Sequence, residues 1–263
     1  MNSSTLCNQK LEGKVVIITG GSSGIGEATA RHFADHGAQA VVIADIQEEK
    51  GLEVASSIGS HRCTFIKCDV TDEQQVKSLV ESTVKIHGKL DVMFSNAGVL
   101  RMSGSEQNIL DFDLEASDKL FAVNIRGMIA CVKHAGRAMV ECGVKGSIVC
   151  TSSVAASTDA TISIDYALSK QAVVGLMRCA SRGLGKHGIR VNYVSPAAVG
   201  TPMMCNWMQT NEEGVEKAFE SLNYLKGGAL KARNVADAVL FLACEDSQFV
   251  TGHNLVVDAG FRP

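Results

Sequence analysis

Short apolar runs alternate with longer helical patterns along the whole chain. Several of the short runs are apolar at every position, which is typical of strands buried on both faces of a sheet. Strands that alternate with helices predict a parallel sheet covered by helices on both faces. The predicted strands are residues 14–19, 39–45, 62–69, 90–95, 146–152, 189–195 and 254–258. The predicted helices include residues 24–36, 72–87, 114–141, 166–186 and 232–244.

The chain carries no sign of a division into domains. No Pro-, Gly- or Ser-rich linker interrupts it, and 263 residues can form one large core. We therefore predict one α/β domain over residues 1–263, a Rossmann-type doubly wound parallel sheet of about seven strands. Residues 1–10 are expected to be flexible. Residues 196–231 are the least regular stretch and follow a strand, so they are a candidate substrate lid.

Composition excludes several classes of partner. A formal net charge of -3 leaves no basic surface, so neither nucleic acid nor an anionic membrane is expected as a partner. The N-terminus lacks the apolar stretch of a secretory signal. No segment approaches the roughly 20 apolar residues that a membrane span needs. We expect a cytoplasmic protein.

Cysteine and histidine spacing does not predict a metal site or a disulfide scaffold. The nine cysteines form no Cys-x-x-Cys pair, and their odd number favours buried thiols in a reducing compartment. His32 and His36 have a spacing that suits metal chelation on a helix, but no third ligand is apparent beside them. No metal is therefore expected.

A glycine-rich turn follows the first predicted strand and opens the first predicted helix. Its glycines allow a tight turn and a close approach of the backbone to a pyrophosphate, and the helix end offers free N–H groups. A helix start without a ligand is the alternative, which the flanking strand and helix disfavour. The candidate cofactor-binding residues of this turn are Gly20, Ser22, Ser23, Gly24, Ile25 and Gly26.

Acidic residues end the next two predicted strands. Asp45, followed by Ile46, lies 19 residues past Gly26, where a carboxylate can accept both ribose hydroxyls of an adenosine and would repel a 2′-phosphate. NAD is therefore favoured over NADP, with a helix cap as the alternative role of Asp45. Asp69, followed by Val70, could bond the adenine amino group or cap a helix, and the sequence leaves both open.

The fourth predicted strand is followed by Asn96, Ala97 and Gly98. Small residues at this place would let a cofactor and the backbone approach each other. A simple turn is the alternative.

Tyr166 and Lys170 lie four residues apart at the start of a predicted helix, so they share one face. A phenol has an ordinary pKa near 10. A nearby ammonium and an oxidised nicotinamide would lower this pKa and make the phenol a proton acceptor. Ser153 lies 13 residues upstream and could hydrogen-bond the substrate oxygen, and Ser152 is the second candidate for that role.

Together these motifs resemble the short-chain dehydrogenase/reductase family, from Leu11 to Gly260. The resemblance implies that Ser153, Tyr166 and Lys170 are catalytic and that Tyr166 and Lys170 also contact the cofactor. It implies that Asn124 holds a water in a proton relay. Val199 and Thr201 would bind the nicotinamide carboxamide. Relatives commonly form homotetramers through the two long helices, here residues 114–141 and 166–186, so a homotetramer is expected.

Within the family the chain resembles the plant terpenoid branch, which includes isopiperitenol dehydrogenases and nepetalactol-related enzymes. Residues 27–31, 131–134 and 249–253 carry that likeness. It implies oxidation of a small apolar terpenoid alcohol or lactol to a ketone or lactone. The alternative is a non-redox cyclase that keeps NAD as a scaffold for an enol or dialdehyde; a non-enzymatic NAD-binding protein is a third hypothesis.

The chain departs from the family pattern around the expected substrate pocket. Ala197 and Ala198 follow Pro196 where glycine is frequent, and residues 154–165 contain no glycine and many small hydroxyl residues. The apolar residues 203–208, with Trp207, could cover an apolar substrate or form an ordinary helix packed on the core.

Overall fold

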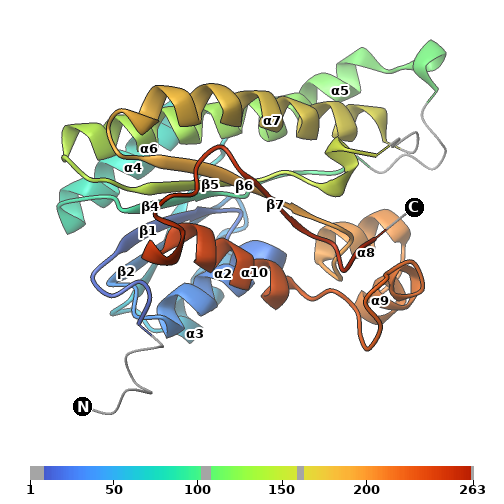
Figure 1. Cartoon of the computed structure of the whole chain (residues 1–263), viewed down its shortest axis with the longest axis horizontal. Coiled ribbons are helices and arrows are strands. Elements are labelled where there is room, and N and C mark those ends of the chain that lie inside the picture. Colours follow the sequence, from blue (N-terminus) through green and yellow to red (C-terminus); the bar gives the residue numbers. More distant parts are fainter. Residues whose placement is uncertain (1–8, 102–107, 159–162, 262–263) are drawn as a thin grey trace.

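The computed structural model describes residues 9–101, 108–158 and 163–261, and its centre is a seven-stranded sheet (Figure 1). The strand order is β3-β2-β1-β4-β5-β6-β7, and every neighbouring pair is parallel. The strands are β1 (Val15–Thr19), β2 (Ala40–Asp45), β3 (Cys63–Lys67), β4 (Val92–Ser95), β5 (Ser147–Thr151), β6 (Arg190–Pro196) and β7 (Asn254–Val257). The predicted single α/β domain of Rossmann type is confirmed, and strand ends differ from the prediction by at most two residues.

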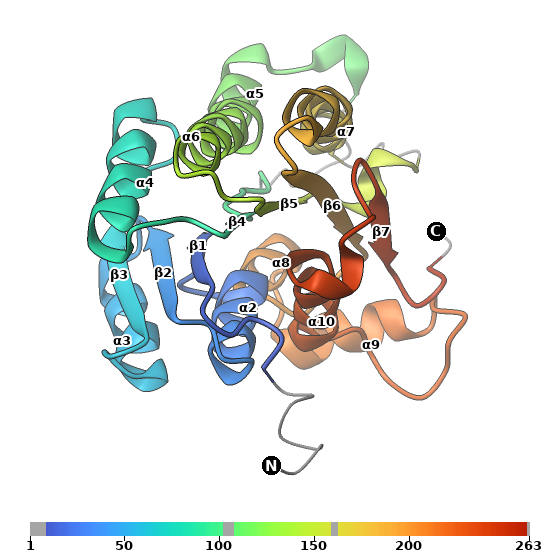
Figure 2. The ribbon, with the colours of Figure 1, turned by 60° about the vertical axis from the view of Figure 1, so that its left-hand side comes forward.

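Helices cover both faces of the sheet, as Figure 2 shows. One face carries α4 (Glu73–His87), α5 (Leu114–Phe121), α6 (Met128–Glu141) and α7 (Ile164–Gly185). The other carries α2 (Gly24–Asp35), α3 (Glu48–Ile58) and α10 (Ala232–Ala243). Two short helices, α8 (Pro202–Met208) and α9 (Glu212–Glu220), follow β6 within the stretch predicted as irregular.

The stretch 114–141, predicted as one helix, contains a break in the regular hydrogen bonding. Residues Ala122–Gly127 form a π-helical segment between α5 and α6. Gly127 packs so closely on Val70 that an added Cβ would lie 2.7 Å from a Val70 methyl. Such segments insert one extra residue into a turn and occur at functional sites. An apolar periodicity does not reveal them, since the flanking turns stay helical.

The sheet divides the core into two apolar clusters. Successive strand residues point to opposite faces, so Met93 joins the cluster under α4, α6 and α7, whereas Phe94 joins the cluster under α2 and α10. Burial of one such side chain contributes roughly 1.5–3 kcal/mol. As expected, most cysteines among the described residues are buried thiols: Cys63, Cys68, Cys131, Cys150 and Cys244.

The amino-terminal end of the chain is only partly described. Residues 1–8 of the segment predicted as flexible lie outside the described residues. Lys10 forms an ion pair with Asp246 at 2.6 Å, and the Leu11 side chain is buried. In the described ranges no helix is long and apolar enough to cross a membrane.

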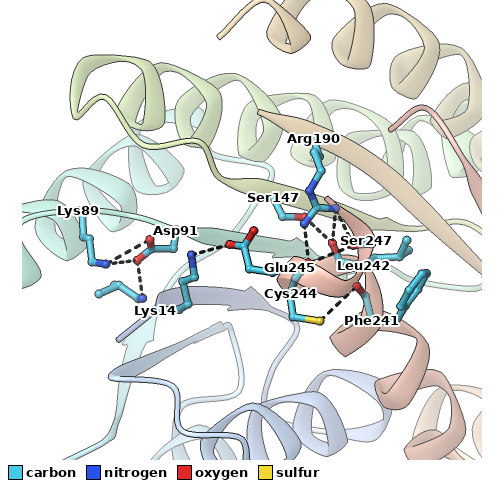
Figure 3. A network of polar contacts seen from close by, with 11 residues as sticks. Lys14, Lys89, Asp91, Ser147, Arg190, Phe241, Leu242, Cys244, Glu245 and Ser247 are labelled. Atoms are coloured by element: carbon cyan, nitrogen blue, oxygen red, sulfur yellow. Dashed lines mark hydrogen bonds and ion pairs between the residues drawn. The ribbon is translucent and has the colours of Figure 1, made fainter. Parts of the chain in front are cut away.

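A polar network fastens α10 to the amino ends of the central strands (Figure 3). Arg190 Nη1 donates to the Leu242 carbonyl and to Ser247 Oγ, both at 2.8 Å, and its Nη2 donates to the Cys244 carbonyl at 3.1 Å. Ser147 Oγ donates to the same Leu242 carbonyl at 2.8 Å. These bonds satisfy carbonyls at the end of α10 that have no partner within the helix.

Asp91 serves the neighbouring strands in the same way. Its Oδ2 accepts the Val15 amide at 2.8 Å and pairs with Lys89 at 3.0 Å. Both networks lie at the amino ends of strands, so they stabilise the sheet on the edge opposite to the carboxyl ends, where ligands bind in such folds.

Arg190→Met should destabilise the fold without altering the ligand site. It removes charge-assisted hydrogen bonds to three partners, which we expect to lower the free energy of unfolding by about 3 kcal/mol. Urea unfolding measures this loss, and Arg182→Met, at an exposed position of α7, is the matched control. Nicotinamide cofactor affinity of the folded variant should stay at the wild-type value; a large loss would place Arg190 in the ligand site after all.

Candidate active site

The turn after β1 comes into direct contact with the end of β4. Gly20 has a φ of +66°, and a Cβ there would lie 2.9 Å from Ala97 Cα. A Cβ on Gly26 would lie 2.0 Å from the Gly20 carbonyl oxygen. Only glycine fits these positions, because the turn is left-handed at Gly20 and the first turn of α2 packs on it at Gly26. The N-terminus of α2 therefore opens directly onto the carboxyl end of the sheet.

Asn96 holds this contact together. Its Nδ2 donates to the carbonyls of Thr19 (3.1 Å) and Gly20 (3.3 Å), and its Oδ1 accepts from Thr151 Oγ1 at 3.1 Å. Thr19 Oγ1 in turn accepts the amides of Asn96 and Ala97. One amide thus links the ends of β1, β4 and β5. The sequence 96–98 is more than a simple turn: it joins three strands at the point where the strand order reverses.

The carboxylates of Asp45 and Asp69 accept hydrogen bonds within the turns at the ends of β2 and β3. Asp45 is buried, and its carboxylate accepts the amides of Ser22 (3.1 Å) and Gln47 (3.0 Å). It is not a helix cap, since the residue preceding α3 is Gln47. Asp69 Oδ1 accepts both the amide and the hydroxyl of Thr71. The cap of α4 is Asp72, so the helix-cap alternative for Asp69 is also excluded.

These turns border a cleft of about 520 Å³ at the carboxyl ends of the strands. Most of the residues predicted to bind the cofactor line it: Gly20, Ser23, Gly24, Ile25, Asp45, Ile46, Asp69, Val70, Asn96, Ala97, Gly98, Tyr166, Lys170, Val199 and Thr201. Ser22 and Gly26 do not line the cleft. Ser22 instead donates its amide to Asp45, and Gly26 packs on Gly20.

Ser153, Tyr166 and Lys170 all line the cleft. Ser153 forms a hydrogen bond with the Tyr166 phenol. The Ser152 hydroxyl is buried and donates to the Lys170 carbonyl at 3.1 Å, so Ser153 and not Ser152 is the partner of the tyrosine. Lys170 Nζ donates to the Thr151 carbonyl at 2.9 Å and lies 5.3 Å from the centre of the Tyr166 ring.

Asn124 lies in the π-helical segment behind this group and does not line the cleft. Its Nδ2 donates to the Val99 carbonyl (2.9 Å) and to Ser169 Oγ (3.1 Å), and its Oδ1 accepts the Val99 amide at 2.8 Å. The side chain therefore links the loop after β4 to α7 at Ser169, the residue before Lys170. The water-holding role implied by the resemblance stays a prediction.

Burial governs the ionisation of the tyrosine and the lysine. It raises the pKa of Tyr166 to about 12, against the smaller lowering effect of the Ser153 hydrogen bond. It lowers the pKa of Lys170 to about 8. The lowering of the phenol pKa that is expected from the ammonium together with an oxidised nicotinamide stays a prediction, because in the protein alone burial is the largest effect. The lysine ammonium bonds the Thr151 carbonyl, and desolvation is the largest effect on both groups.

Apolar side chains cover the other side of the cleft. Met203, Met204 and Trp207 of α8 line it, and α8 contains no fully buried residue, so this helix does not pack its apolar face into the core. Phe219 of α9 and Phe261 near the chain end lie with ring centres 5.9 Å apart and line it as well. These two phenylalanines were not foreseen, because neither belongs to a motif and each enters the cleft from a different segment.

His32 and His36 lie beside other polar groups in the structure. His36 Nδ1 lies 2.9 Å from the His32 carbonyl, and His32 Nε2 lies 2.8 Å from Asp237. Within the ranges that the structure covers, no three His, Cys, Asp or Glu side chains gather in a way that could hold a metal ion.

Comparisons with known proteins agree with this geometry. The family described as "Enoyl-(Acyl carrier protein) reductase" matches residues 20–262. A (+)-cis,trans-nepetalactol synthase of Nepeta racemosa is 55% identical over 95% of this chain and 94% of its own. The (-)-isopiperitenol/(-)-carveol dehydrogenase of Mentha piperita, named as mitochondrial, is 51% identical over 97% and 95%. A crystal structure of a short-chain dehydrogenase/reductase from Mycobacterium marinum has a TM-score of 0.86 at 30% identity, covering 97% and 98%.

The fold and the site thus define a nicotinamide-binding α/β oxidoreductase. The chain belongs to the short-chain dehydrogenase/reductase family, in its plant terpenoid branch. Since one relative is named as mitochondrial, the cytoplasmic location stays a prediction, and so does the homotetramer.

Lys170→Met should change how stability depends on pH. The pKa of Lys170 is about 8 in the folded chain and 10.5 ordinarily, so between these values the unfolded chain binds more protons at this site. A lysine with a lowered pKa destabilises the folded state most at low pH. Between pH 8 and 10 the free energy of unfolding of the wild type should therefore rise by about 2 kcal/mol relative to that of the variant.

Urea unfolding of both proteins across this pH range measures the gain. Lys186→Met, at the exposed end of α7, is the control and should run parallel to the wild type. Parallel curves for Lys170→Met as well would mean that the buried ammonium has an ordinary pKa.

Proposed function

We propose that the protein oxidises a small cyclic terpenoid alcohol or lactol to a ketone or lactone, with NAD as hydride acceptor. The observation that carries this proposal is the Ser153–Tyr166 hydroxyl pair, which lies in the cleft together with the glycine turn and an apolar wall. A substrate hydroxyl between these two groups would face polar partners, while its hydrocarbon ring would lie against Met203, Met204 and Trp207.

The side chains divide the proton chemistry among them. Bound NAD would supply the hydride-acceptor chemistry of the reaction. Ser153 hydrogen-bonds the substrate oxygen and orients it, and Tyr166 accepts the hydroxyl proton. Lys170 would hold the cofactor ribose and place a positive charge near the phenol. Because burial raises the pKa of Tyr166, the phenolate needs positive charge nearby, which Lys170 and the cationic ring of oxidised NAD would supply together.

The cradle for the cofactor fits a dinucleotide. The backbone at Gly20 and Gly26 leaves no room for a Cβ, and the α2 N-terminus supplies the unpaired N–H groups that bind phosphate. The buried Asp45 carboxylate favours NAD, because a 2′-phosphate at this place would meet a negative charge. The nearby lysines are engaged: Lys50 bonds Gln47, and Lys67 pairs with Glu48.

The substrate class rests on the apolar wall and on the names of the relatives. A nepetalactol synthase and an isopiperitenol/carveol dehydrogenase both act on small terpenoids by their names. We assign residues 196–231, with α8 and α9, as the substrate lid, since both helices supply side chains to the cleft.

Asp45→Asn should weaken the preference for NAD. Removing the negative charge lowers the repulsion of a 2′-phosphate, and we expect the ratio of NADP to NAD affinity to rise about tenfold. Calorimetric titration with each cofactor gives the ratio. Asp69→Asn is the control, because Asp69 lines the same cleft and its loss should affect both cofactors equally. An unchanged ratio in Asp45→Asn would contradict the assignment of NAD.

Oxidation is tested with the purified chain, NAD and a panel of terpenoid alcohols and lactols. Reduced nicotinamide should form, with the ketone or lactone identified by mass spectrometry, and the rate should rise with pH because the reaction needs the phenolate. Tyr166→Phe should lose activity about 100-fold or more. Tyr193→Phe, in β6 and outside both the cleft lining and residues 196–231, is the matched control. A cyclised product without reduced nicotinamide would instead identify a cyclase.

A further inference from the structure

Residues 258–261 form a tight turn directly after β7. Asp258 Oδ1 accepts the Gly260 amide at 2.9 Å, and the Asp258 carbonyl accepts the Phe261 amide at 2.8 Å. Ala259 and Gly260 both have left-handed backbone conformations, with φ of +51° and +74°. This conformation is strained for alanine and persists only where the surrounding structure holds it. The turn therefore fixes the direction in which the chain reaches Phe261.

The same turn is bonded to the segment that follows α9. The Ala259 carbonyl accepts the amides of both Tyr224 and Leu225 at 3.0 Å. A Cβ on Gly260 would lie 3.0 Å from Tyr224 Cβ, so the two backbones pack closely. These contacts join the end of β7 to the carboxyl-terminal side of the substrate lid (Figure 2).

Phe261 contributes its ring to the lining of the cleft, where it meets Phe219 of α9. The two ring centres lie 5.9 Å apart at an interplanar angle of 45°. Aromatic pairs at this distance attract each other beyond the effect of burying their surface. Phe219 and Phe261 both line the cleft, as does Trp207. The lid is thus joined to the chain end in two ways, by a ring contact and by backbone hydrogen bonds.

We propose that Phe219 and Phe261 are specificity-determining residues, which together bind the hydrocarbon part of the substrate between the lid and the chain end. The proposal rests on the proposed function and names what these rings recognise. A phenyl ring offers apolar surface and no hydrogen-bonding group. The pair therefore selects for alkyl groups on the ring of the alcohol or lactol, while Ser153 and Tyr166 bind its oxygen.

Asp258 is a positioning residue in this proposal. It does not line the cleft, and it acts through the two hydrogen bonds that shape the turn before Phe261. Its loss should therefore affect the same ligands as the loss of the Phe261 ring.

The fluorescence of Trp207 measures binding without turnover. It is the only tryptophan of the chain and lines the cleft, so a ligand in the cleft should change its emission. The probes are menthone and cyclohexanone, titrated with NAD present. Neither ketone can be oxidised by NAD at its carbonyl carbon, and menthone differs from cyclohexanone by methyl and isopropyl groups. Wild type should bind menthone at least about tenfold more tightly.

Phe261→Ala and Phe219→Ala should each weaken menthone binding about tenfold and cyclohexanone binding less than about threefold. Because the rings form one site, the double variant should lose less than the product of the two single losses. Asp258→Ala should shift the menthone affinity in the same direction as Phe261→Ala. Asp258→Asn keeps an oxygen that can accept the Gly260 amide and should stay near wild type.

Phe249→Ala is the matched control. Phe249 is 94% exposed and lies outside the cleft lining, so both affinities should stay at the wild-type values. Equal losses for the two ketones, or an unchanged menthone affinity in Phe261→Ala, would overturn the proposal. So would a wild type that does not discriminate between the ketones.

Failure to fold is covered within the same set. If Phe261→Ala does not fold, Phe219→Ala decides: a selective loss of menthone binding supports the proposal, and an unchanged affinity overturns it. Selective ketone binding without any oxidation of alcohols would contradict the proposed function and leave this inference standing. Oxidation with no selective loss in the variants would do the reverse.

Discussion

The contact between the turn after β1 and the end of β4 is the constraint on which the rest of the site depends. Its atoms approach so closely that Gly20 and Gly26 admit no side chain. The Asn96 side-chain amide donates hydrogen bonds to the carbonyls of Thr19 and Gly20, which the turn would otherwise leave unpaired. Because Asn96 also bonds Thr151, the same residue sets the distance between the cofactor cradle and the strand that leads to Ser153. The cleft is therefore a consequence of how three strand ends are joined.

The two ends of the strands have different tasks. At the amino ends, Arg190 and Asp91 satisfy backbone groups of α10 and β1 and hold the sheet together. At the carboxyl ends, backbone amides at the start of α2 and hydroxyl groups face the cleft. The bonds of Arg190 and Asp91 do not involve Ser153 or Tyr166, so these two hydroxyl groups are free to serve chemistry.

Desolvation is the leading electrostatic effect in the active site. It disfavours the charged forms of both Tyr166 and Lys170, in opposite pKa directions and for one cause. The hydrogen bond from Ser153 orients the Tyr166 phenol, and the bond to the Thr151 carbonyl orients the Lys170 ammonium. Neither bond outweighs desolvation. The extent to which the site excludes water therefore governs the ionisation of both groups.

The sequence by itself determined the sheet, the glycine turn and the residue types of the active site. Apolar runs of strand length and motifs such as Tyr166 to Lys170 are local properties, so they are readable without coordinates. It did not show the π-helical segment around Asn124, because one extra residue in a turn leaves the periodicity of both flanking helices intact. The sequence placed Ser153 ahead of Ser152, but the physical reason appears only in the structure, where Ser153 bonds the Tyr166 phenol and Ser152 bonds the Lys170 carbonyl.

Tertiary structure alone decided the contacts between distant segments. Phe219 and Phe261 share the cleft because α9 and the chain end fold to the same place, and Arg101 reaches Asp165 across 64 residues of sequence. The ionisation of Tyr166 in the protein alone also belongs here, because burial, which no local pattern reports, raises the pKa of the phenol. Local spacing determines which groups are available, and packing determines their solvent, their partners and hence their charge.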